Sequence, residues 1–189
     1  YYYYGGGVYI ASGGQLTMTG GNIIGCSAES GGGVCIDGEP GQFSMSGGSI
    51  AGCVASEIGG GVCVSGTFKM SGQAVIRSCT VESATQSIYG GGIYVNSSSF
   101  EMSGEAKIEY CQAISNSSKS SNGGGVYLTN NTKFTLSGSA VIQNCTATNS
   151  ANHGEAYGGG VSADCVKEIT LADSARIVGC TAANGSGLY

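Results

Sequence analysis

Apolar and polar residues alternate in three short segments that recur along the chain. In their first occurrence, apolar residues fall at Val8 and Ile10, then at Leu16 and Met18, and then at Ile23. A period of two residues is typical of a strand with one buried face, and no window has the period of an amphipathic helix. The pattern therefore predicts three short strands in each occurrence and no helix.

A glycine triplet followed by Val or Ile marks the start of each occurrence. The triplets begin at Gly5, Gly31, Gly59, Gly90, Gly123 and Gly158. Internal repeats of this length are typical of solenoids, in which each coil buries its apolar face against its neighbours. Glycine also suits a sharp corner that needs positive φ. The repeats predict one all-β domain over residues 1–189, a parallel β-helix (β-solenoid) of about six coils with three short strands each.

Composition and charge remove several classes of protein. The chain has 36 Gly and 10% charged residues, against about 7% Gly and roughly 25% charged residues in an average domain. This balance argues against a helical or Rossmann-type enzyme. Seven Lys and Arg residues and a net charge of −5 form no basic patch, so no nucleic-acid partner is expected. No stretch approaches the ~18 apolar residues of a membrane span.

One cysteine occurs at the same turn of every repeat, and we call these six residues the cysteine file. They are Cys26, Cys53, Cys79, Cys111, Cys145 and Cys180. Three interpretations remain open: small apolar side chains that fill an inner corner, disulfides between adjacent coils, and metal ligands. The main prediction is a structural packing role. No C-x-x-C pair is present, so no metal site and no cofactor are expected.

The remaining cysteines lie elsewhere in the repeat. Cys35 and Cys63 occupy a column that holds Tyr in other repeats, and alternation predicts that this column faces outward. They are therefore the candidates for a disulfide or for exposed thiols, together with Cys165, which has no counterpart in its own column. Nine is an odd number, so at least one thiol is free or pairs with another chain.

The repeats lengthen along the chain through loops that precede the later triplets. The loops 82–89, 114–122 and 148–157 are rich in Ser, Asn, Thr and Tyr, and insertions in a solenoid fall on one edge. The candidate binding residues are Tyr89, Asn116, His153 and Tyr157, which predict recognition of glycans or protein surfaces. The alternative is that the loops vary in length without consequence.

Catalytic residues are not expected. His153 is the only histidine and lies in the longest loop, and the acidic residues are scattered. Two pairs of opposite charge, Arg77 with Glu109 and Lys69 with Glu101, fall at equivalent positions of adjacent repeats and predict ion pairs between strands. A polysaccharide-active enzyme is the alternative function, and an ice-binding solenoid is a minor one.

Several Asn-x-Ser/Thr sequences are candidate glycosylation sites. The acceptors in predicted surface positions are Asn96, Asn116, Asn130 and Asn184. They are relevant where the host glycosylates secreted chains.

The repeat motifs resemble those of a known group. GGG(V/I)Y(V/I), F-x-MSG and I-x-G-C-x-A are similar to the Gly-rich repeats of polymorphic outer-membrane proteins and autotransporter-like surface proteins, in the pectin-lyase-like β-helix superfamily. The resemblance implies a right-handed β-helix at the cell surface or outside the cell. This chain carries Cys where such repeats often carry Asn.

These patterns together predict a stalk, a surface adhesin or a filament subunit without catalytic activity. No capping helix precedes the first repeat or follows the last in this sequence, and solenoids protect their terminal coils with polar caps. The chain is therefore expected to be a fragment of a longer array or a unit that associates end to end with other copies.

Overall fold

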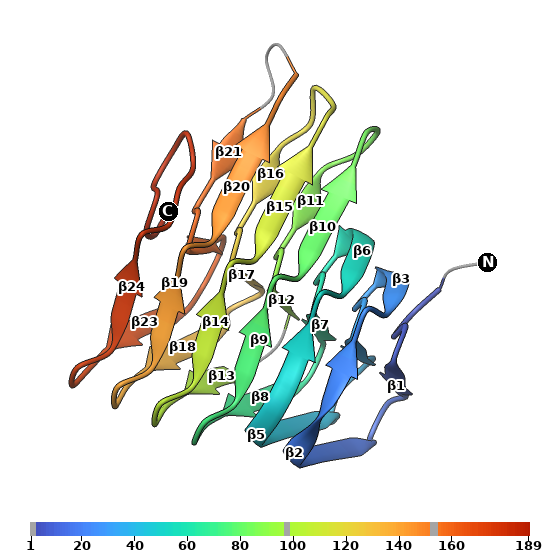
Figure 1. Ribbon diagram of the computed structural model, residues 1–189, viewed down its shortest axis with the longest axis vertical. Coiled ribbons are helices and arrows are strands. Elements are labelled where there is room, and N and C mark those ends of the chain that lie inside the picture. Colours follow the sequence, from blue (N-terminus) through green and yellow to red (C-terminus); the bar gives the residue numbers. More distant parts are fainter. Residues whose placement is uncertain (1–2, 97–98, 152–154) are drawn as a thin grey trace.

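The computed structural model describes residues 3–96, 99–151 and 155–189, and these residues form strands and turns without a helix. The paired strands of the three sheets are parallel, and strands from successive repeats lie side by side across the molecule (Figure 1). The prediction of an all-β chain is confirmed. No helix in the described part of the chain is long and apolar enough to cross a membrane.

Three parallel sheets each take strands from successive repeats. The six-stranded sheet contains β1 (Val8–Ile10), β4 (Val34–Ile36), β7 (Val62–Val64), β12 (Ile93–Asn96), β17 (Val126–Thr129) and β22 (Val161–Ala163). The ten-stranded sheet contains β2 (Gln15–Ile24), β5 (Gln42–Ala51), β8 (Thr67–Met70), β9 (Val75–Arg77), β13 (Ser99–Met102), β14 (Lys107–Glu109), β18 (Lys133–Leu136), β19 (Val141–Gln143), β23 (Glu168–Leu171) and β24 (Arg176–Val178). The eight-stranded sheet contains β3 (Ser27–Ser30), β6 (Val54–Ile58), β10 (Thr80–Ser83), β11 (Ile88–Tyr89), β15 (Gln112–Ser115), β16 (Ser121–Asn122), β20 (Thr146–Asn149) and β21 (Ala156–Tyr157).

The prediction of three strands per repeat is wrong for the middle repeats. The first two repeats have three strands each, whereas the third, fourth and fifth have five. One extra break falls between β8 and β9, where Gly72 has a φ of +57° and the chain turns. The other falls between β10 and β11 and between their later counterparts, where the loop insertions divide a strand that is continuous in β6. These three repeats therefore contribute strands to the same three sheets, but each contributes five strands in place of three.

Phenylalanine and methionine side chains fill the core in continuous columns. Phe43, Phe68 and Phe100 face one another on adjacent strands, with ring centroids 4.7 and 5.1 Å apart and nearly parallel planes. Met45 and Met70 pair in the next inward position of the same strands, and both are 1% exposed. Alternate positions of these strands are exposed, so the predicted period of two is confirmed in the core.

The glycine triplets form the corner that the sequence predicts. Gly90 has a φ of +71°, and the first glycine of each of the six triplets lies in the same left-handed region. The next glycine is restricted by space instead. A Cβ on Gly91 would lie 2.3 Å from the carbonyl oxygen of Gln112 and 2.4 Å from that of Gly124. Backbone of the same repeat and of the next repeat therefore approaches this glycine more closely than any side chain allows.

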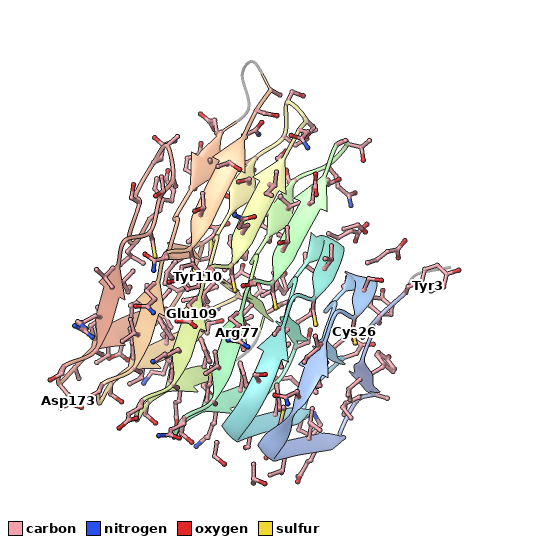
Figure 2. The ribbon with its side chains drawn as sticks, in the orientation of Figure 1. Tyr3, Cys26, Arg77, Glu109, Tyr110 and Asp173 are labelled. Carbon is pink, nitrogen blue, oxygen red and sulfur yellow. The ribbon has the colours of Figure 1, made fainter. Side chains whose placement is uncertain are left out.

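One of the two predicted ion pairs forms. Lys69 Nζ lies 3.2 Å from Glu101 Oε2, with both side chains about half exposed. Arg77 and Glu109 lie opposite each other on β9 and β14, as Figure 2 shows, but the Glu109 carboxylate accepts a hydrogen bond from Gln143 instead, at 2.7 Å. The predicted Arg77–Glu109 ion pair is absent from the described contacts, and the bonded partner of Glu109 is Gln143 on the next strand, β19.

Candidate functional site

The loop residues predicted for recognition separate into two groups. Tyr89 and Tyr157 are the last residues of β11 and β21, each directly before a glycine triplet, and both line a groove at the glycine corner. Asn116 lies in the loop after β15, where its amide nitrogen donates to Glu82 on β10 and its Oδ1 accepts from Ser150 in the loop after β20. His153 lies outside the described residues. The structure therefore brings Tyr89 and Tyr157 to one surface and places Asn116 elsewhere.

The groove, which we call the tyrosine groove, lies between the residues that flank the triplets on both sides. It consists of two connected pockets, with volumes of about 300 and about 260 Å³, which share Tyr89 and Tyr127. The larger pocket is lined by Tyr89, Ser120, Asn122, Tyr127, Tyr157, Ser162, Ala163, Asp164 and Tyr189, and the smaller by Tyr89, Tyr94, Tyr127 and Thr129. The larger volume is at the lower end of the range for small-ligand sites.

Tyrosine rings form two clusters along the groove. Tyr94 and Tyr127 stack on adjacent strands with centroids 5.7 Å apart, and Tyr89 leans against Tyr127 at 4.7 Å. Tyr157 and Tyr189 form the second cluster, with centroids 4.6 Å apart. The larger pocket lies between these clusters and is lined by rings from both.

Small polar side chains occupy the interval between the two clusters. Ser162 pairs with Tyr127 on the adjacent strand and is 3% exposed. Asn122 lies on β16, between Tyr89 on β11 and Tyr157 on β21, and is 8% exposed. The Asn122 amide nitrogen donates to the Ile88 carbonyl at 3.3 Å and to Ser120 Oγ at 3.0 Å. The floor of the larger pocket is therefore polar, while its walls are aromatic.

The electrostatics of the groove favour neutral phenols and disfavour anions. Burial raises the pKa of Tyr94 to about 12, and burial followed by the nearby Asp164 charge raises the pKa of Tyr127. A hydrogen bond to Glu155 raises the pKa of Tyr157 to about 12. These phenols keep their protons at neutral pH. Tyr157 donates its proton to Glu155, whereas Tyr94 and Tyr127 can donate theirs to a ligand. No Lys or Arg lies among the described lining residues, and Asp164 adds negative charge.

The raised pKa of Tyr94 makes stability depend on pH above the usual phenol range. Between about pH 10 and about pH 12 the unfolded chain releases this proton and the folded chain keeps it, so the free energy of unfolding falls as pH rises. Urea denaturation at about pH 9 and about pH 11 is expected to show this loss, and Tyr94→Phe is expected to reduce it. An equal loss in wild type and variant would show that Tyr94 ionises like an exposed phenol.

A similar tyrosine pair lies at the first repeat. Tyr4 and Tyr9 stack with centroids 6.1 Å apart beside a pocket of about 590 Å³, and the Tyr9 hydroxyl donates to Asp37 at 2.9 Å. On the strands between this pair and the tyrosine groove, the positions equivalent to these tyrosines include Ile58, Cys35 and Cys63. The tyrosine-rich corner is therefore interrupted in the second and third repeats.

The six residues of the cysteine file lie against the third glycine of each triplet. A Cβ on Gly33 would lie 3.2 Å from Cys53 Sγ, and the same approach recurs in the other repeats. Each thiol donates to the carbonyl two residues earlier, as Cys145 does to Gln143 at 3.3 Å. Burial raises the pKa of Cys111. All nine cysteines of the chain are free thiols in the structure, and the role of the file stays a prediction.

The prediction that the side chains of Cys35 and Cys63 are exposed is wrong. Cys35 is 3% exposed and Cys63 is 4% exposed, although both point away from the main core. Tyr9 and Tyr94 stand on the adjacent strands of the same column, and these larger side chains enclose the two thiols between them. Cys165 is exposed, as predicted, and donates to Asp164 at 3.3 Å.

The predicted glycosylation acceptors lie at accessible positions. Asn116, Asn130 and Asn184 are exposed, and Asn96 is half-buried at the end of β12. The Asn130 amide nitrogen donates to Asn96 Oδ1 on the adjacent repeat. Whether these residues carry glycans stays a prediction, since it depends on the host.

Of the groove residues, only Tyr89 and Tyr157 were singled out from the sequence, and Tyr94, Tyr127 and Ser162 are among those that were not. The sequence places them in one column with Tyr9, Cys35 and Cys63, and alternation predicted only that this column faces away from the core. The available signal was the pair of tyrosines that flank a triplet, Tyr89 and Tyr94. In a corner, residues on both sides of the triplet face the same concave space.

Comparisons with known protein families, with curated proteins and with solved structures found no match for this chain.

Proposed function

We propose that this chain is a segment of a right-handed parallel β-helix that serves as a non-catalytic adhesive scaffold, outside the cell or on its surface. The order of strands supports the helix, because each repeat adds its strands beside those of the preceding repeat in three parallel sheets. A chain that visits the same sheets in turn and advances by one strand each time winds as a solenoid. The resemblance of the repeats to surface-protein repeats supports the location.

The tyrosine groove is the observation that carries the adhesive function. Tyrosine combines an apolar ring with a polar hydroxyl and loses little conformational freedom on binding, so it is frequent in recognition surfaces. The groove holds five tyrosines from adjacent repeats, four of them on strands and the fifth, Tyr189, on a segment that is hydrogen-bonded to β22. Surfaces built on such elements keep their geometry without a ligand.

Binding is favoured over hydrolysis by the chemistry of the lining. Glycoside hydrolysis uses two carboxyl groups about 5 to 9.5 Å apart. Asp164 is the one carboxylate among the described residues that line the groove, and its Oδ1 accepts a hydrogen bond from the Cys165 thiol. The lining therefore provides hydrogen-bond donors and aromatic rings, which suit recognition of an unaltered ligand.

A retention assay with product analysis tests this proposal. The purified chain is applied to surfaces of cellulose, chitin, polygalacturonate, heparin and gelatin, and bound protein is measured after washing. In the same samples, new reducing ends and unsaturated uronates report hydrolysis and elimination. We expect retention on at least one surface with no product above the protein-free control. Product release on any polysaccharide, or retention on none of the five surfaces, would overturn the proposal.

A further inference from the structure

We infer that the larger pocket of the tyrosine groove, between Tyr127 and Tyr189 and above Ser162, is a binding site for an uncharged pyranose ring of a glycan. This inference rests on the proposed adhesive function and names the chemical class of its ligand. We call the pocket the Ser162 slot. It depends on three features: the spacing of the aromatic walls, the unpartnered hydroxyl of Ser162 on its floor and the absence of cationic side chains among the described lining residues.

The spacing of the walls follows from the strand order. Tyr127 lies on β17, Ser162 on the adjacent strand β22, and Tyr189 on the next segment. The backbone of Tyr189 itself makes two hydrogen bonds with β22. Two strand spacings of about 4.8 Å separate Tyr127 from Tyr189 by about 9.6 Å. A flat ring between two aromatic rings needs roughly 9 Å, twice the ~4.5 Å spacing of an offset-stacked pair. One ring-shaped group therefore fits the interval that Ser162 leaves open.

The floor of the slot contains one hydroxyl, that of Ser162, that no described residue satisfies. Ser162 is 3% exposed, and its hydroxyl has no hydrogen-bond partner in the described part of the chain. In the described part of the chain, every side-chain N or O that is completely buried has a hydrogen-bond partner. The Ser162 hydroxyl has none, so it is not completely buried and faces the pocket that it lines. A buried hydroxyl that lacks a protein partner needs one from water or ligand. The hydroxyl groups of a sugar supply such partners.

The charge of the slot selects among sugars. Asp164 is the one charged side chain among the described lining residues, and the remaining polar groups of the floor are the neutral side chains of Ser120, Asn122 and Ser162. A carboxylated or sulfated sugar would bring a second negative charge beside Asp164 without a cation to pair with it. The lining therefore fits hydroxyl-rich uncharged rings and disfavours uronates and sulfated sugars.

A substitution within the same column can close the slot. The column already accepts tyrosine on adjacent strands, at Tyr94 and Tyr127, which stack at 5.7 Å. Ser162→Tyr therefore continues an existing stack and occupies the space between the walls. Tyr127→Ala removes one wall and serves as a second variant if the first one lowers the melting temperature. Tyr9→Ala, in the same column at the first repeat, is the matched control.

Calorimetric titration with soluble hexasaccharides tests the site. The probes are cellohexaose, maltohexaose and the hexamer of N-acetylglucosamine as uncharged ligands, hexagalacturonate as an anion and the hexamer of glucosamine as a cation. We expect at least one uncharged hexamer to bind, the anion to bind at least about tenfold more weakly, and Ser162→Tyr and Tyr127→Ala each to weaken binding at least about tenfold. Tyr9→Ala is expected to leave binding unchanged.

The outcomes separate this site from the adhesive function. Unchanged binding by a folded Ser162→Tyr and by Tyr127→Ala would overturn the slot. Tighter binding of the anion or of the glucosamine hexamer than of every uncharged probe would overturn the choice of ligand. In either case, retention of the wild-type chain on one of the five surfaces would leave the adhesive function standing. Loss of retention on all of them would reject that function and the slot together.

Discussion

Met70→Asp is expected to destabilise the chain by about 4 kcal/mol or more and to leave much of it unfolded at room temperature. The Met70 side chain is 1% exposed and lies between Met45 and Met102 on adjacent strands. A carboxylate at this point would be buried without a cation, because the surrounding column is apolar. Circular dichroism during thermal denaturation measures the effect.

Ser44→Asp is the matched control for this substitution. Ser44 is exposed on β5 and lies opposite Lys69 on β8, so the new carboxylate would face solvent beside a positive charge. The expected change in unfolding free energy is within about 0.5 kcal/mol. Similar melting temperatures for Met70→Asp and Ser44→Asp would mean that the inward and outward faces of these strands have been assigned the wrong way round.

The second large effect is expected from Gly91→Ala, which should destabilise the chain by about 3 kcal/mol. Gly91 is the middle glycine of its triplet, and a Cβ there would lie 2.3 Å from the backbone of Gln112. The obstacle is backbone on two sides, Gln112 of the same repeat and Gly124 of the next repeat, and backbone cannot turn aside as a flexible side chain can. These segments would have to move apart, so urea denaturation should show a lower midpoint.

Gly20→Ala provides the comparison for the corner glycine. Gly20 is an exposed residue of β2, and a Cβ there would have no heavy atom within 4 Å. The same substitution is expected to change stability by no more than about 0.5 kcal/mol. A midpoint for Gly91→Ala close to that of Gly20→Ala would contradict the tight approach of coils at the triplets.

Most of the fold could be predicted from the sequence, because its periodicity has a direct physical cause. Side chains alternate between the faces of a strand, so the Phe and Met columns of the repeats identify one buried face. The division of strands could not be predicted in the same way. Across the turn at Gly72, the spacing of the apolar columns grows by one residue, from five between Met45 and Ile50 in β5 to six between Met70 and Ile76. One added residue suits a bulge in a continuous strand as well as a turn, and only backbone pairing distinguishes the two.

The candidate site was harder to predict, because it depends on which residues meet across a corner. Tyr89 and Tyr157 stood out by their place before a triplet, whereas Tyr127 and Ser162 belong to a strand after one. The exposure of a side chain also depends on the size of the residues at the same position of the adjacent strands. For this reason alternation gave the correct face for Cys63 but the wrong exposure, since Tyr94 covers it.

Ligand recognition in the tyrosine groove can be tested by mapping amide chemical shifts on the full chain. The titrant is whichever uncharged hexasaccharide binds the chain, and the amide signals are followed to saturation. Recognition in the groove predicts that the largest changes fall on Tyr127, Ser162 and Asp164, with little change in the loop that contains Asn116. Changes centred on the Asn116 loop, with the groove signals unmoved, would contradict it.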